Sequence, residues 1–456
     1  MVQSFPQKLG TLMRSDGFRR AVVLFGGRAF NPLVSLVYGI LAGKLLVVED
    51  YGIYGKALSF IFVVQAITEV GLQQSLVRFL AHAIGASDEN RIRAILRASL
   101  QLKLYGLAAA SAIFLLLIGL IAGAPALGGL GLKIDLLRLA HPDLIHLAWL
   151  VFLGGVGLSL LTYLDSVLVS HQSYFRLAIW LPSVGMIRLL MLAWFFYTNE
   201  GLRVDHVLFA FALGPFLSVL LFFLVFPADF FLARAGRSEW KPWIRRLFGF
   251  NLWIMVASFL AILSDWMEVF IIHRTADTGL FNAARLPMQG FLILLTTMNS
   301  FLLPRLAGLE GPSQYRNFFL RIYQVLIPAV VLFLPGFFIF PWFLLWWFGP
   351  EYAPSVTVFY ILYPNFILRL YFAPLGTALF ALDQPLLIAI EAGLRMSTGL
   401  VLNLILYNMA GIEGAAWASL LAQATGWIFL LYCYGRYFRT GNFPLDRVGW
   451  YGRDAD

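Results

Sequence analysis

Long apolar stretches alternate with short polar turns along almost the whole chain. Stretches of 18 or more mostly apolar residues recur, and each is long enough to cross a hydrocarbon core of roughly 30 Å as a helix. Since a helix satisfies its backbone amides internally, it suits lipid. The pattern predicts an all-α, polytopic membrane protein with about twelve spans, whose cores are 21–47, 53–83, 98–124, 145–169, 175–198, 205–228, 247–272, 281–306, 318–348, 355–382, 385–409 and 412–435. In span 9, Pro328, Pro335 or Pro341 can break the helix.

The composition agrees with a chain that lies mostly in lipid. Of its 456 residues, 60% are hydrophobic and 12% are charged, whereas soluble domains carry about 25% charged residues. A single cysteine, Cys433, excludes a disulfide framework. The six histidines fall near span ends without the spacing of a metal site, so we expect no metal and no cofactor.

The basic residues are distributed unevenly between the two predicted sides of the membrane. With an even number of spans, 22 of the 33 lysines and arginines, Lys103 among them, fall on the side of the termini, and 5 fall in the opposite loops. This bias predicts that both termini are cytoplasmic. The net charge of +9 therefore reflects membrane topology and does not indicate nucleic-acid binding.

Two short segments repeat at a fixed offset. GIYGKA (52–57) resembles GLFNAA (279–284), and LVRF (76–79) resembles LPRL (303–306), both at an offset of 227 residues. The repeat predicts an N-terminal lobe of spans 1–6 (1–230), a cytoplasmic loop (231–244) and a C-terminal lobe of spans 7–12 (245–456). Transporters built from such halves place the substrate between them. The alternative is chance similarity between apolar segments.

Several segments, in order along the chain, carry a resemblance to a known family. They are EDYGIY (49–54), VGLQQSLVRF (70–79), GLF (279–281), LPRLA (303–307), FGPEYA (348–353), ALDQP (381–385) and GIEGAAWA (411–418). Together they resemble the Wzx-like polysaccharide and O-antigen flippases of the multidrug/oligosaccharidyl-lipid/polysaccharide exporter superfamily. Glu69 departs mildly from the family, which often has an aspartate there.

The resemblance implies a function as well as a fold. It implies two six-helix lobes arranged as a V around a central cavity, in a bacterial inner-membrane protein. It also implies transport of a lipid (undecaprenyl) pyrophosphate-linked oligosaccharide from the cytoplasmic to the periplasmic leaflet, without catalysis by this chain. In agreement, the sequence lacks a Gly-x-x-x-x-Gly-Lys-Ser/Thr phosphate loop. Expected partners are this substrate, membrane lipids, and a polysaccharide polymerase with other assembly proteins.

Arginines inside the predicted spans are the first candidates for substrate binding. A charge within the bilayer is costly, so it usually faces a cavity or a partner, and the planar guanidinium binds phosphate bidentately. The resemblance places Arg28 and Arg285 where the family builds its cavity, and Arg188 and Arg369 are further candidates. For each, the alternative is a structural pair or a side chain reaching the interface. For Arg395 we expect a local ion pair with Glu391, four residues earlier.

Acidic residues inside the spans are candidates for ion coupling. Asp265 and Glu268 lie three apart in span 7, so they share one helical face and would repel each other if both were ionised. One pKa should then rise, which suits coupling to a proton or sodium ion. Alternatively, they neutralise Arg285 or Arg274. Glu69 is a further coupling candidate.

Other functions remain open at this stage. A cation-coupled drug antiporter of the same superfamily needs an acidic cavity, but basic candidates slightly outnumber acidic ones within the spans. The candidates are six basic residues, Arg28, Lys56, Arg188, Arg285, Arg369 and Arg395, and five acidic residues, Glu69, Asp165, Asp265, Glu268 and Glu391. A membrane glycosyltransferase or ligase could use Arg138, His141 and Asp143 of the loop at 125–144. A membrane scaffold would not need the charges within the spans.

Overall fold

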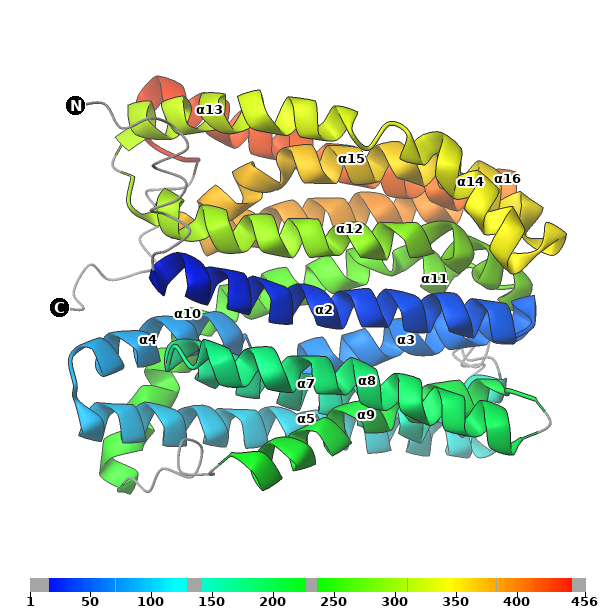
Figure 1. Ribbon diagram of the computed structural model, residues 1–456, viewed down its shortest axis with the longest axis horizontal. Coiled ribbons are helices and arrows are strands. Elements are labelled where there is room, and N and C mark those ends of the chain that lie inside the picture. Colours follow the sequence, from blue (N-terminus) through cyan, green and yellow to red (C-terminus); the bar gives the residue numbers. More distant parts are fainter. Residues whose placement is uncertain are drawn as a thin grey trace. The chain divides into compact units, whose positions relative to one another are not determined.

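The computed structural model of the protein describes residues 16–69, 71–128, 142–199, 201–226, 236–309, 311–382 and 384–444. Within these ranges the secondary structure is helical and contains no strand (Figure 1). The α-helices are α2 (Asp16–Leu45), α3 (Val48–Glu69), α4 (Leu72–Gly85), α5 (Glu89–Gly128), α7 (Pro142–Ser170), α8 (Tyr174–Thr198), α9 (Val204–Val225), α10 (Arg237–Asp265), α11 (Met267–Ile271), α12 (Thr275–Ala307), α13 (Gly311–Val331), α14 (Gly336–Phe348), α15 (Ala353–Ala381) and α16 (Pro385–Thr440).

Each predicted span falls on a helix, a broken helix or half of a long helix. Seven of the described helices are long and apolar enough to cross a membrane. Spans 11 and 12 form the two halves of α16, which are separated by non-helical backbone at Ala410 and Gly411. Span 9 is broken near Pro335, between α13 and α14, whereas Pro328 and Pro341 stay within helices. These elements confirm the predicted all-α, polytopic fold class.

Two breaks were not predicted, because each lies inside a segment that was read as a single span. Span 2 divides into α3 and α4 at Gly71, whose φ of 64° favours glycine. A Cβ there would lie 3.2 Å from Asn251 O on α10. Span 7 divides at Trp266 into α10 and the short helix α11. Both breaks lie beside acidic residues that are candidates for ion coupling. Glu69 precedes the first break, and Asp265 and Glu268 flank the second.

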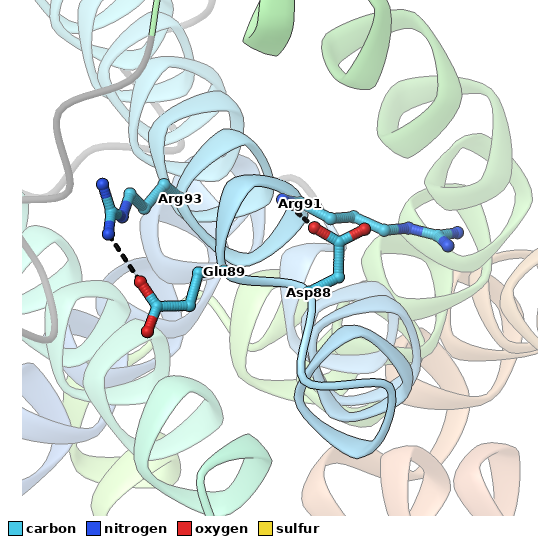
Figure 2. Close-up of polar contacts among 4 residues, drawn as sticks. All are labelled: Asp88, Glu89, Arg91 and Arg93. Atoms are coloured by element: carbon cyan, nitrogen blue, oxygen red, sulfur yellow. Dashed lines mark hydrogen bonds and ion pairs between the residues drawn. The ribbon is translucent and has the colours of Figure 1, made fainter.

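The first turn of α5 is fixed by local polar contacts (Figure 2). The Asp88 carboxylate accepts a hydrogen bond of 3.0 Å from the Arg91 backbone N–H, which is the geometry of an N-terminal cap. One turn further on, Glu89 pairs with Arg93 at 2.6 Å. The helix therefore begins nine residues before the predicted span core at 98 and continues into it without interruption.

The described chain forms two compact units, Met1–Ile293 and Leu294–Asp456. In the first unit, α7 packs against α3, α4 and α9, and α5 packs against α10. In the second, residues of α12, α13, α15 and α16 form a separate apolar core. The boundary between these units, at residues 293 and 294, differs from the predicted boundary between the lobes at 231–244. The two predicted lobes stay a prediction. Residues 237–244, expected as part of the inter-lobe loop, instead form the first turns of α10.

Glycines bring the starts of α3 and α12 into direct contact within the first unit. A Cβ at Gly52 would collide with Thr275 O, and one at Gly279 would collide with Val48 O. The offset of 227 residues relates Gly52 to Gly279 and Val48 to Thr275, so each of these two contacts is the repeat equivalent of the other. The same offset relates Gly55 to Asn282, and these two residues contact each other. Small residues permit this close approach of helices in membranes. The reciprocal packing supports the predicted internal repeat.

Candidate functional site

The break between α10 and α11 gathers three of the predicted site residues. Asp265 is the last residue of α10, Glu268 lies in α11, and Trp266 stands between the two helices. Arg285 of α12 places its guanidinium carbon 4.3 Å from the centre of the Trp266 ring. The indole in turn stacks on Phe62 of α3 at 5.3 Å. Two helices and a break thus hold one cation over an aromatic face, a favourable electrostatic contact.

The environment of Arg285 leaves part of its side chain accessible. The residue is half-buried, as is Asp265, whereas Glu268 is only 4% exposed. All three have polar or electrostatic contacts. A guanidinium that stacks on one face can donate hydrogen bonds from its edge to two oxygens of a phosphate. This arrangement suits the predicted role of Arg285 in binding an anionic group.

The premise that Asp265 and Glu268 share one helical face is wrong. That premise required a continuous helix, but Trp266 has φ −115° and ψ 8°, which ends α10. The two acids therefore belong to different helices. Their role in ion coupling, and the alternative that they neutralise Arg285 or Arg274, both stay predictions.

Arg188 of α8 is enclosed by the packing of its neighbours. It is 3% exposed, and its Nε donates a 3.1 Å hydrogen bond to Phe211 O. Its guanidinium carbon lies 3.7 Å from the Phe211 ring centre. Gly214 makes room for it, since a Cβ there would lie 2.7 Å from the Arg188 Cγ. This environment favours the structural alternative for Arg188.

The remaining predicted arginines lie in different surroundings. Arg28 is part of α2, but its side chain is outside the described residues. Arg369 of α15 is half-buried and has a partner. Arg395 confirms the expected local pair, with its Nε 3.7 Å from Glu391 Oε1. It also donates a 2.9 Å hydrogen bond to Gln423. The structure therefore brings Arg285 near the acids of span 7.

Lys103 is a buried cation that the sequence interpretation assigned to the cytoplasmic surface. It is 2% exposed, and its Nζ donates hydrogen bonds to Thr68 O at 3.1 Å and Ser159 O at 2.8 Å. It also contacts the Ser159 hydroxyl and interacts electrostatically with Glu69. Its position inside the predicted span 98–124 was the signal that could have identified it. Lys103 therefore joins α5 to α3 and α7 through hydrogen bonds, and its charge acts on Glu69.

Lys56 also has a partner within the protein. Although it lies near the start of α3, it is only 8% exposed. Its Nζ donates a 3.1 Å hydrogen bond to His273 O, just before α12. This bond adds to the glycine contacts between the starts of α3 and α12.

The loop proposed for a glycosyltransferase or ligase lies largely outside the described residues. Arg138 and His141 are not described, and nothing is described of the Asp143 side chain in α7. Within the described part of the chain, no group of three or more His, Cys, Asp or Glu residues could hold a metal ion.

Comparison with solved structures reveals the same fold in membrane transporters. The lipid II flippase MurJ in an inward closed conformation superposes with a TM-score of 0.61 and 13% identity, over 93% of this chain and 88% of that one. A multidrug resistance MATE family transporter in an outward-facing conformation gives 0.57 and 15%, over 94% and 98%. A MATE protein in complex with MaL6 gives 0.57 and 14%, over 91% and 94%. This chain has the MATE and MurJ fold.

At 13–15% identity, these similarities show a shared fold and do not assign an activity to this chain. No protein-family model matches the chain. Among curated proteins, the probable low-salt glycan biosynthesis flippase Agl15 of Haloferax volcanii is 24% identical over 266 residues. The match spans 56% of this chain and 54% of the relative, so the chain spans about half the length of the curated relative that it matches. The named neighbours are transporters and flippases.

Proposed function

We propose that this protein is a flippase for a lipid (undecaprenyl) pyrophosphate-linked oligosaccharide, within the superfamily that the sequence motifs resemble. The observation that carries the proposal is the sequence similarity to a glycan biosynthesis flippase, on a fold shared with a lipid II flippase. The substrate moves from the cytoplasmic to the periplasmic leaflet of the bacterial inner membrane, for synthesis of O-antigen or exopolysaccharide. Both termini are cytoplasmic in this proposal.

Arg285 is the proposed contact for the pyrophosphate. Moving two phosphates through a membrane requires cations that replace their hydration, because an unpaired charge in lipid is costly. Arg285 is half-buried, and Trp266 supports the face of its guanidinium. Arg28 and Arg369 remain proposed contacts.

Ion coupling is proposed at the acids beside the two helix breaks. Asp265 and Glu268 flank Trp266, and Glu69 precedes the Gly71 break. A proton or sodium ion bound at a carboxylate changes the local charge, and a break between helices provides a place where this change can alter backbone geometry. Glu69 would exchange the ion for its interaction with Lys103.

Alternating access requires the close contact between α3 and α12 to open. Both helices start at the predicted periplasmic side, and a Cβ at Gly55 would lie 2.6 Å from the Asn282 Cγ. Cysteines at these two positions would therefore bring their β-carbons within disulfide range. In a Cys433→Ala background, oxidation of Gly55→Cys/Asn282→Cys should stop transport, and reduction should restore it. Continued transport by the fully oxidised protein would contradict alternating access at this contact.

The test of the proposed function is flipping of a lipid pyrophosphate-linked oligosaccharide in proteoliposomes. Arg285→Ala should reduce the rate at least tenfold, whereas Arg305→Gln, an exposed arginine on the same helix, should leave it within twofold. An imposed proton or sodium gradient should change the wild-type rate. Unchanged flipping in Arg285→Ala would contradict the site, and the absence of flipping in wild type would contradict the substrate.

A drug antiporter is the second candidate, because several similar structures are MATE proteins. It predicts extrusion of organic cations from the same proteoliposomes, driven by the gradient. Cation extrusion without oligosaccharide flipping would replace the proposed function with this one.

A further inference from the structure

A groove lies between α5 and α10 on the surface of the first unit. Its volume is about 680 Å³, within the range of small-molecule sites. Its apolar lining comes from both helices and from the end of α3, and consists of Ile67, Leu102, Tyr105, Ala109, Ile244, Phe248 and Met255. Tyr105 is 56% exposed and Phe248 is 44% exposed. An exposed apolar groove of this kind accommodates a hydrocarbon chain better than a sugar or a free ion.

Three cations border the groove on one face of α10. Arg237, Lys241 and Arg245 follow one another at intervals of four residues and line the groove. They are exposed, and no ion pair is found for them among the described residues. The nearby Glu239 accepts a 3.1 Å hydrogen bond from the Gly236 N–H and so caps the helix. At 1.5 Å per residue the row extends over about 12 Å, which is longer than one phosphate requires.

The groove lies beside a helical segment with the properties of a membrane interface. The two halves of α10, Arg237–Gly249 and Asn251–Asp265, are bent by 46° relative to each other. The first half carries Trp240 and Trp243 among its basic residues, a combination that favours the level of the lipid headgroups. Arg91 and Arg246 place their guanidinium groups 5.1 Å and 5.2 Å from the Trp243 ring. The basic residues assign this surface to the predicted cytoplasmic side.

We propose that this groove binds an anionic phospholipid of the cytoplasmic leaflet. The phosphate lies against the row of Arg237, Lys241 and Arg245, and one acyl chain lies on Tyr105 and Phe248. A soluble anion would not use the apolar lining, and a neutral lipid would not use the cations. A bilayer phospholipid fits better than the lipid-linked oligosaccharide, because the cations form an open row at the surface and do not converge around a headgroup.

The bound lipid would contact the segment that contains the Gly71 break. Ile67 lies two residues before Glu69, and Leu102 precedes Lys103, whose Nζ bonds to Thr68 O. Met255 N would lie 3.4 Å from a Cβ at Gly71. The lipid would therefore stabilise the packing of α5 and α10 around this break. This inference goes beyond the proposed function and does not depend on it.

The test is native mass spectrometry of the purified full chain with added phosphatidylglycerol or phosphatidylcholine. Arg237→Gln/Lys241→Gln/Arg245→Gln should lower the affinity for phosphatidylglycerol about 100-fold, since each cation near a membrane surface contributes about a factor of five. The matched control is Arg316→Gln/Arg321→Gln/Arg436→Gln, which removes three exposed arginines from the same predicted side. This control should change the affinity less than twofold.

A second variant tests the apolar part of the groove without changing its charge. Ala109 is exposed and lines the groove, so Ala109→Trp should fill it and reduce binding of phosphatidylglycerol at least fivefold while the protein stays folded. Wild type should also show a higher unfolding temperature with phosphatidylglycerol than with phosphatidylcholine.

Three outcomes would overturn the proposal. Equal loss of lipid in the groove variant and the control variant would show diffuse surface attraction. Displacement of the lipid by inorganic phosphate would show a site for a soluble anion. If the groove variant lost binding of added lipid pyrophosphate-linked oligosaccharide but still bound phosphatidylglycerol, the groove would be a site for the lipid-linked oligosaccharide.

Discussion

Basic side chains are buried in the helical core around α7–α9 but only half-buried at the break between α10 and α11. In the core, Arg188 and Lys103 are 3% and 2% exposed and donate hydrogen bonds to backbone carbonyls. At the break, Arg285 is half-buried and lies over Trp266. All three are basic residues within predicted spans. A charged residue in a predicted span therefore needs a partner or a cavity. Its burial and contacts in the structure decide whether its role is structural or in binding.

The largest effect is expected at Lys103. Lys103→Met removes the cation that interacts with Glu69 and the two hydrogen bonds that it donates to Thr68 O and Ser159 O. Each hydrogen bond made by a charged group contributes about 1.5–3 kcal/mol, so we expect a clear decrease in the unfolding temperature in detergent. The double variant Lys103→Met/Glu69→Gln should recover part of this loss. Strictly additive effects in this double-mutant cycle would contradict an energetic link between the two residues.

A smaller effect on stability is expected at Arg188. Arg188→Ala removes the bond to Phe211 O and the contact with its ring, at a cost of about 2–3 kcal/mol. Arg188→Met keeps most of the volume and removes the buried charge, so its unfolding temperature should lie close to that of wild type. Flipping per folded molecule should be unchanged in Arg188→Met. A stable Arg188→Met protein without flipping would assign Arg188 to the substrate and remove the difference between the two regions.

The fold could be predicted further than the site, for a physical reason. Hydropathy reports which segments lie in lipid, and each predicted span core corresponds to described helical structure. The breaks at Gly71 and Trp266 escaped prediction because each lies inside one predicted span. Backbone geometry at Gly71 also depends on packing against residues such as Asn251. Lys103 escaped because the charge count assigned it to a side of the membrane. Its partners Thr68 and Ser159 are distant in sequence and known only from packing.

The internal repeat was suggested by the sequence, and contacts in the structure support it. The offset of 227 residues came from short matches, which chance could produce. The structure places the repeat-related residues Gly55 and Asn282 in contact, and it pairs Gly52 with Thr275 as it pairs Gly279 with Val48. Chance similarity does not predict reciprocal packing of this kind. Short motifs therefore become informative when the same offset also relates their contacts.

The smallest effect is expected from a substitution that keeps the charge at the break. Arg285→Lys retains a cation near Trp266 but loses the planar guanidinium, and with it the bidentate geometry and the stacked face. A cation–π contact contributes about 0.5–2 kcal/mol, so flipping should fall roughly 2- to 30-fold, less than in Arg285→Ala. The unfolding temperature should stay close to that of wild type because the residue is half-buried. Full activity in Arg285→Lys with loss in Arg285→Ala would show that a point charge suffices, and a decrease in stability as large as that of Arg188→Ala would place Arg285 with the structural cations of the core.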